Sequence, residues 1–112
     1  MDGIVIPPGE GEPIRQHRVL AELPELEAFV LRFGPDFEGV DLHTHSDHVD
    51  AFYVLEGEAE FTVDGEVIRA GPGTWVAAPR GVEHGFRVVG DRDLVFLNVH
   101  GPNTGFGRRL RD

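Results

Sequence analysis

Short apolar runs separated by turn residues recur along this chain. Apolar and polar positions alternate within many of the runs, which is the period of a half-buried β-strand, and no long stretch has helical spacing. Fifteen glycines and eight prolines lie between the runs and predict many turns. The pattern predicts strands at residues 14–20, 26–33, 40–45, 51–55, 59–63, 67–70, 74–78, 84–89 and 94–99. We therefore expect an all-β protein whose short antiparallel strands close into one small barrel.

Two of the predicted turns indicate β-hairpins. Glu56-Gly57-Glu58 offers a glycine that can adopt a positive φ, and Asp64-Gly65 has the residues that favour the type I′ turn. The last run, Leu94–Val99, is almost continuously apolar. It predicts a strand covered on both faces, either inside the barrel or at a subunit contact.

Length and composition indicate a single folded domain. The chain has 112 residues, of which 40% are hydrophobic and 27% charged, which is a globular composition. We expect residues 14–100 to form the barrel. Residues 1–13 would form an N-terminal arm, with Ile4-Val5-Ile6 as an edge strand or a dimer contact, and residues 101–112 a C-terminal tail.

Charge and hydropathy narrow the possible partners. The formal net charge is -10, which argues against nucleic acid and anionic membranes as partners, because both require clustered positive charge. The arginines at 108, 109 and 111 are interpreted as a solvated terminus without a function. No run approaches the length of a membrane span, and the acidic, proline-rich start does not look like a signal peptide, so we expect a cytoplasmic protein.

Histidines supply the candidate chemistry. The chain has no cysteine, so any metal ion must be held by nitrogen and oxygen ligands. His43 and His45 lie two residues apart in a predicted strand, so both project from one face and could bind the same ion. Such a pair alone is more often two surface histidines, so further residues are needed to support a metal site.

The residues that follow resemble two motifs of the cupin family. The first motif is His-x-His, three or four residues, Glu, six residues and Gly, which this chain matches at His43, His45, Asp50 and Gly57. Tyr53 to Glu58 is also similar to that family. The second motif runs from Gly73 through Pro79 and Gly81 to His84, with fifteen residues between the two motifs. The resemblance covers most of the chain and implies a small single-domain cupin of the jelly-roll type.

The resemblance implies a metal site inside the barrel. By it, His43, His45, Asp50 and His84 converge on one divalent transition-metal ion, which could be Mn, Fe, Co, Ni, Cu or Zn. Three imidazoles and a carboxylate leave one or two coordination positions open for water or substrate.

The chain departs from the family motifs at three positions. Asp50 replaces the usual Glu, Val88 replaces the final Asn, and Gly39 lies closer to the first histidine than is usual. The shorter Asp50 could coordinate directly, act through a water molecule or leave a three-histidine site. His48 is a substitute ligand in principle, although a solvated loop position is the simpler interpretation. The two remaining histidines, His17 and His100, have no motif support, so we expect exposure or a local hydrogen bond.

Three functions are compatible with this sequence. The first is a metal-dependent enzyme, an isomerase or a dioxygenase-like cupin, acting on a small sugar acid or carbonyl compound, with no catalytic residue identified. The second is a non-catalytic module that binds a small ligand. The third, a purely structural barrel, is the least favoured, because four polar ligands inside a barrel without an ion would cost stability. A homodimer is expected in each case.

Overall fold

Two antiparallel sheets form the molecule. The computed structural model describes residues 3–112; Met1 and Asp2 lie outside the described residues. The elements are β1 (Glu12–Ile14), β2 (His17–Glu22), β3 (Glu27–Phe33), β4 (Val40–His43), β5 (Val49–Glu56), β6 (Glu58–Val63), β7 (Glu66–Ala70), β8 (Trp75–Ala78), β9 (His84–Val89), β10 (Leu94–Gly101) and α1 (Phe106–Arg111).

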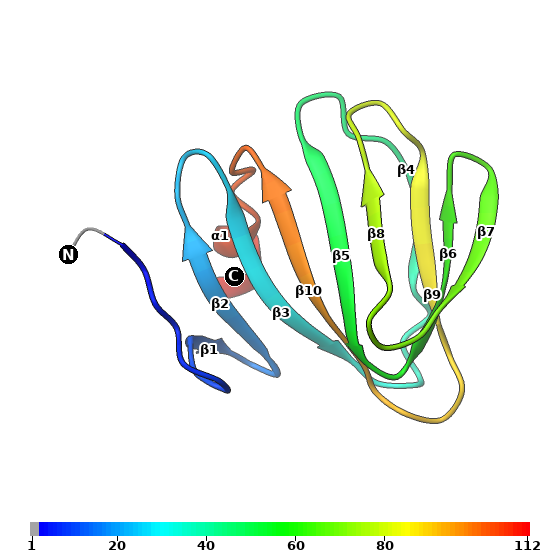
Figure 1. Ribbon diagram of the computed structural model, residues 1–112, viewed down its shortest axis with the longest axis horizontal. Helices are drawn as coiled ribbons and strands as arrows, with labels where there is room; N and C mark the ends of the chain where they lie inside the picture. The colour runs from blue at the N-terminus through cyan, green and yellow to red at the C-terminus, as the bar shows by residue number, and fades with distance from the viewer. Residues whose placement is uncertain (1–2) are drawn as a thin grey trace.

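The sheets pack face to face around an aromatic core. One sheet has the order β1-β2-β3-β10-β5-β8 and the other β4-β9-β6-β7 (Figure 1). Their inner faces contribute the buried phenylalanines of the core, Phe29, Phe52, Phe61, Phe86 and Phe96. The all-β, antiparallel, jelly-roll prediction is confirmed. The strands form two sheets, however, where the sequence led us to expect one closed sheet.

Strand β10 lies at the centre of the larger sheet. It pairs with β3 on one side and with β5 on the other. Leu94, Val95 and Phe96 are buried, while Leu97 and Val99 are partly buried on the outer face. The inner face of this strand is therefore fully covered by the core and its outer face only in part.

One of the two predicted hairpins forms and the other does not. β6 and β7 pair through Asp64 and Gly65, whose φ angles of 52° and 78° suit a type I′ turn. β5 and β6 belong to different sheets, so the expected hairpin at Gly57 is wrong. Gly57 instead lets the chain cross between the sheets. A Cβ there would lie 2.2 Å from the Asp93 carbonyl oxygen, so only glycine fits.

Both ends of the chain differ from the sequence-based expectation. Residues 4–6 are exposed and form no strand; the edge strand is β1, further along the chain. At the other end, α1 packs against the six-stranded sheet through Phe106 (Figure 1). Arg111 forms ion pairs with Glu12 and Glu22, at 2.9 and 2.6 Å. The C-terminal arginines are exposed, as expected for a solvated terminus, but these ion pairs also hold Arg111 against the sheet.

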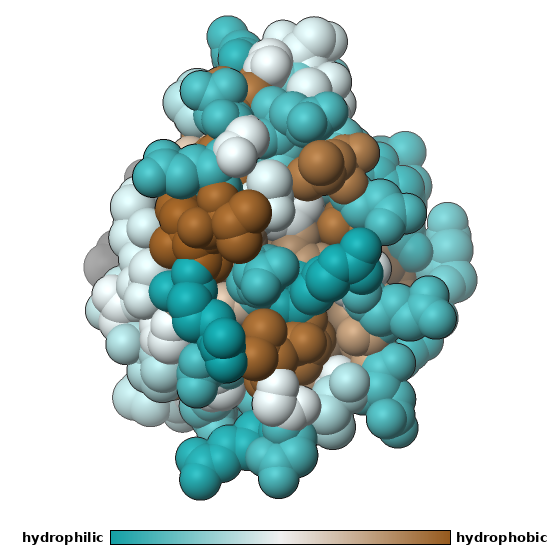
Figure 2. Space-filling model, turned by 90° about the vertical axis from the view of Figure 1, so that its right-hand side faces the viewer, coloured by the Kyte–Doolittle hydropathy of each residue, from teal (hydrophilic) through white to brown (hydrophobic). Residues whose placement is uncertain are grey.

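The outer surface is mixed in polarity. Figure 2 shows apolar patches separated by hydrophilic side chains on the face that it presents. The outer face of the four-stranded sheet carries charged residues, including Glu60 and Arg87, paired across β6 and β9. No helix among residues 3–112 has the length and apolar character needed to cross a membrane.

Candidate metal centre

Pairing of β4 with β9 places two of the four expected ligands opposite each other. His43 and His84 are register partners, with ring centroids 4.4 Å apart. The backbones approach closely here, because a Cβ on Gly85 would lie 2.6 Å from the Val40 carbonyl oxygen. The register shifts between Val40 and His43, so both residues line one cavity. Residues three apart on a regular strand point to opposite faces, and the bulge explains why Val40 and His43 do not.

The other two expected ligands come from the chain after β4 and from the opposite sheet. The strand ends at His43, short of the predicted end at residue 45, but the ring of His45 still lies 4.6 Å from that of His43. Asp50 is buried at the start of β5. Its Oδ2 is 2.9 Å from His84 Nε2 and 3.7 Å from His45 Nε2. One ligand atom from each of the four residues lies within 4.8 Å of all the others.

The hydrogen bonds of the histidines fit a cation at this point. His84 Nδ1 lies 2.9 Å from the Val82 carbonyl oxygen and His43 Nδ1 lies 2.8 Å from that of Asp41. Donation of Nδ1–H to these oxygens leaves a lone pair on each Nε2. The Nε2 lone pair of His84 then faces the carboxylate of Asp50, and two acceptors at this distance require a cation between them. A proton or a metal ion satisfies this requirement.

The second oxygen of Asp50 is held by the neighbouring strand. Asn98 Nδ2 donates to Asp50 Oδ1 at 2.8 Å, and His100 Nε2 lies 3.3 Å from the same oxygen. Oδ2 therefore remains directed at the histidines. Although Asp50 is shorter than the Glu of the motif, its position in β5 brings it within reach of them.

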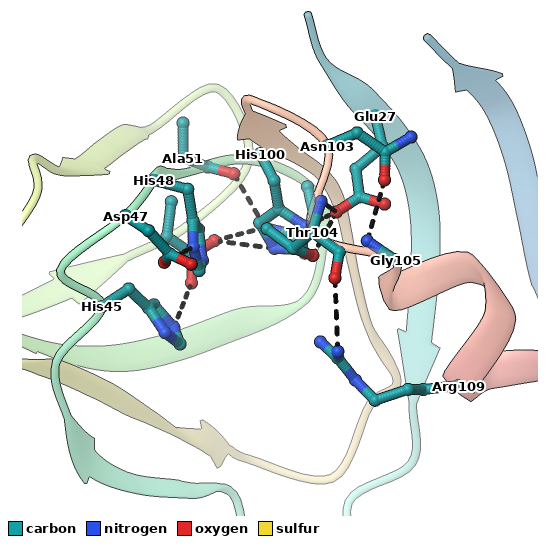
Figure 3. A network of polar contacts seen from close by, with 12 residues as sticks. Glu27, His45, Asp47, His48, Ala51, His100, Asn103, Thr104, Gly105 and Arg109 are labelled. Atoms are coloured by element: carbon teal, nitrogen blue, oxygen red, sulfur yellow. Dashed lines mark hydrogen bonds and ion pairs between the residues drawn. The ribbon is translucent and has the colours of Figure 1, made fainter. Parts of the chain in front are cut away.

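A chain of buried polar groups continues behind Asp50. His100 Nδ1 lies 2.8 Å from Glu27 Oε2, which also accepts hydrogen bonds from the backbone N–H and the hydroxyl of Thr104 (Figure 3). Glu27 is completely buried, and its Oε1 has no partner among the described residues. Sequence reasoning did not identify Asn98, His100 or Glu27. The signal available was that Asn98 and His100 are polar residues in and directly after an apolar run.

Burial and charge shift the pKa values of these groups. Burial and the neighbouring histidines lower the pKa of His45 to about 4, so its imidazole is neutral and able to ligate at neutral pH. Burial raises the pKa of Asp50, but hydrogen bonds from His100, His84 and Asn98 outweigh that effect and hold it below its usual value. Burial likewise opposes the positive charge on His84 and His100, yet the Asp50 carboxylate raises the pKa of both.

The remaining histidines divide between the site and the core. His48 is buried, its ring lies 4.1 Å from that of His45, and its Nδ1 is 2.8 Å from Asp47 Oδ1. The interpretation of His48 as a solvated residue is therefore wrong. His17 accepts a hydrogen bond from the Arg32 backbone N–H at 3.1 Å, which confirms the local role expected for it.

A small, mostly apolar cavity opens onto the four residues. Its volume is about 180 Å³, below the roughly 300–1,000 Å³ of sites that hold drug-sized ligands. Phenylalanines 33, 52, 86, 96 and 106 form much of the wall, and Asn98, Thr104 and Arg109 are polar lining residues outside the histidine cluster. The geometry suits a small molecule with polar oxygens at one end.

Comparison with known proteins agrees with this architecture. The model of the Cupin domain family matches residues 29–100. The chain belongs to the cupin family. Among solved structures, this cupin is similar to KdgF from Halomonas sp., with 26% identity, a TM-score of 0.74 and 81% of each chain covered. An RmlC-like cupin from Shewanella frigidimarina has 25% identity and a TM-score of 0.71, over 81% of this chain and 78% of its own.

A curated relative is an enzyme. The cupin is 29% identical to quercetin 2,3-dioxygenase of Bacillus subtilis (strain 168) over 116 residues. The match covers 96% of this chain but only 34% of the relative, so this chain spans about a third of the length of that enzyme.

Proposed function

We propose that this cupin is a metal-dependent enzyme acting on a small oxygenated molecule, such as a sugar acid or another carbonyl compound. In this proposal His43, His45, Asp50 and His84 hold one divalent transition-metal ion. The observation that carries the proposal is the convergence of three imidazoles and an ionised carboxylate at one point of a cavity. Mn, Fe, Co, Ni, Cu or Zn would suit this set of ligands.

The protein groups around this point have separable roles. A divalent ion held there would polarise a carbonyl or hydroxyl oxygen of the substrate as a Lewis acid. Asn98 and His100 fix the orientation of Asp50, and the phenylalanine wall excludes water from the reacting end. His48, whose ring lies beside that of His45 and has one nitrogen on Asp47, is a further group that could move a proton.

The size of the cavity limits the substrate. A volume of about 180 Å³ favours sugar acids and keto acids over flavonols. Because quercetin 2,3-dioxygenase is a relative, a substrate screen should also include quercetin with oxygen.

A non-catalytic module that binds a small ligand is the second candidate. The mostly aromatic wall favours it, because most of these side chains can offer contacts and exclude water but not acid–base chemistry.

Elemental analysis of protein purified without metal-affinity steps tests the proposal. We expect about one equivalent of a transition metal in the wild type and little in His43→Ala or His84→Ala. His17→Asn is the control, since His17 lies outside the site. Wild-type protein that neither contains a metal nor takes up added Mn, Fe, Ni or Zn would contradict the metal site. Metal binding with no turnover in the screen would favour the binding module.

A further inference from the structure

The C-terminal segment is fastened to the sheet at two points. Arg111 reaches Glu12 through Nε at 2.9 Å and Glu22 through Nη2 at 2.6 Å. Thr104, at the start of this segment, binds the buried Glu27 through its backbone N–H at 2.8 Å. These charge-assisted bonds fix the position of α1 relative to the cavity.

Within that segment Arg109 is held at the cavity. Phe106 packs edge-on against Phe29 and His100, with ring centroids 5.2 and 5.3 Å apart. The Arg109 guanidinium lies 5.6 Å from the centroid of the Phe106 ring. Arg109 also lines the cavity, and Figure 3 shows its side chain extending from α1 toward Thr104.

The guanidinium of Arg109 has unused donors. Within residues 3–112 its one hydrogen bond is a long one, 3.4 Å from Nη1 to the Thr104 carbonyl oxygen. By contrast, the guanidinium groups of Arg32, Arg69 and Arg111 pair with carboxylates. Only these three of the ten arginines form ion pairs among the described residues, so Arg109 is distinguished from the other unpaired arginines by its position at the cavity. Arg109 is also the only arginine or lysine in the described cavity wall.

We infer that Arg109 binds a carboxylate of the ligand, so that the cavity selects small carboxylic acids. The ligand would place a polar oxygen at the four-residue metal centre and its carboxylate at Arg109, where a planar guanidinium can donate two parallel hydrogen bonds. This inference rests on the proposed function, because it assumes that the His43, His45, Asp50 and His84 end of the cavity binds the other end of the ligand.

Dicarboxylates of increasing length provide the probe. Protein loaded with Co²⁺ is titrated with malonate, succinate and glutarate, and then with the monoamide of whichever acid binds most tightly. Binding is measured by the visible absorption of Co²⁺ and by calorimetry. The monoamide has almost the same shape but lacks one charge. We expect the diacid to bind the wild type roughly tenfold more tightly than its monoamide.

Substitutions assign that preference to a residue. Arg109→Gln should lower the affinity for the diacid to that for the monoamide, while Arg109→Lys should retain part of the preference. Arg108→Gln is the matched control, since Arg108 lies on the same helix and carries the same charge but does not line the cavity. An equal loss in both Gln variants, or no preference in the wild type, would overturn the inference.

Co²⁺ binding is measured first in every variant, so that failure of the metal centre is recognised separately. If Co²⁺ does not bind to the wild type, the proposed function fails, and calorimetry with the diacids alone still tests Arg109. If Co²⁺ binds equally to the wild type and to Arg109→Gln but neither prefers the diacid, the metal centre stands and the role of Arg109 is refuted.

Discussion

At the scale of single residues, the candidate site depends on groups that hold Asp50 in place. Asp50 has one oxygen directed at His84 and His45 and the other bound by Asn98. Asn98 also donates to the Ala51 carbonyl oxygen at 2.9 Å, so its amide is fixed by two acceptors. A side chain that touches no ion can therefore determine how well an ion is bound.

Asn98→Ala should weaken metal binding without removing any of the four ligands. The loss of the Nδ2 donor frees Asp50 to rotate, and such second contacts are typically worth about 10–100-fold in metal affinity. Calorimetric titration with Co²⁺ or Zn²⁺ measures the change. Asn103→Ala serves as the control, because Asn103 binds the Gly105 N–H and not Asp50. Unchanged affinity in Asn98→Ala would show that Asp50 is oriented by other contacts.

The metal-free protein should lose stability as pH rises above 6.5. His100 and His84 have pKa values raised above their ordinary 6.5, because Asp50 stabilises their charged forms against the effect of burial. Their contribution to folding is complete below 6.5 and is lost as pH passes through the raised pKa values. Denaturant unfolding in the presence of a chelator measures this slope, which His100→Gln should reduce. A free energy of unfolding that is flat or rising from pH 6.5 to 8 would contradict the assignment.

Glu27 should act in the opposite direction at low pH. Its burial raises the pKa, but the hydrogen bonds from Thr104 and His100 outweigh that effect and hold the pKa below 4.5. Stability from Glu27 is therefore present above 4.5 and lost as pH falls through the lowered pKa. The same unfolding series, extended below pH 4.5, should show this loss in the wild type and less of it in Glu27→Gln.

At the scale of elements, Gly57 lies at one of the crossings between the two sheets. Gly57 has a φ of 76° between β5 and β6, and a Cβ there would lie against the Asp93 and Leu94 backbone. Gly65 has a similar φ of 78°, but a Cβ there would contact nothing within 4 Å. The two positions therefore separate backbone strain from steric crowding.

Gly57→Ala should be more destabilising than Gly65→Ala. Both substitutions carry the cost of a left-handed backbone, about 1–2 kcal/mol, but only the first forces a methyl group against backbone atoms, which adds about 1–3 kcal/mol. Chemical denaturation of the two variants gives the difference in the free energy of unfolding. Equal losses would show that the crossing can move to make room.

The sequence predicted most of the strands and the four clustered residues, and it failed where contacts are distant along the chain. The motifs around His43 and His84 are local spacings, so they could be read directly. The failed hairpin at Gly57 and the role of His100 depend on which strands become neighbours, for which the chain gives no local signal. His48 was misjudged in part for the same reason, because its ring lies beside the distant His100 as well as the nearby His45.

At the scale of the whole molecule, the two outer faces differ in character. The outer face of β5 and β8 exposes Val49, Tyr53, Leu55 and Trp75, whereas the central strands β6 and β9 of the other sheet expose Glu60 and Arg87. Tyr53 and Trp75 are register partners, and their ring centroids are 6.5 Å apart. We propose that a second copy of this chain covers the apolar face and forms the expected homodimer.

Trp75→Glu should convert that dimer to a monomer. Trp75 is 57% exposed on the edge strand β8, and a carboxylate there would be desolvated at the interface. Light scattering coupled to gel filtration should give twice the 12.4 kDa chain mass for the wild type and one chain mass for the variant. Val67 is 61% exposed on the other sheet, so the Val67→Glu variant should stay dimeric. A monomeric wild type would refute the interface.

The candidate ligands are divided between the sheets, and this division bears on exchange kinetics. His43 and His84 belong to the four-stranded sheet, whereas Asp50 belongs to the six-stranded one. A bound ion would therefore link the two sheets, and the sheets could not separate at that end without breaking a coordination bond. The rate at which an ion leaves the protein would then depend on how often the two sheets separate locally at that end. A chelator could occupy an open coordination position from the cavity, but it would remove the ion only when the sheets separate at that end.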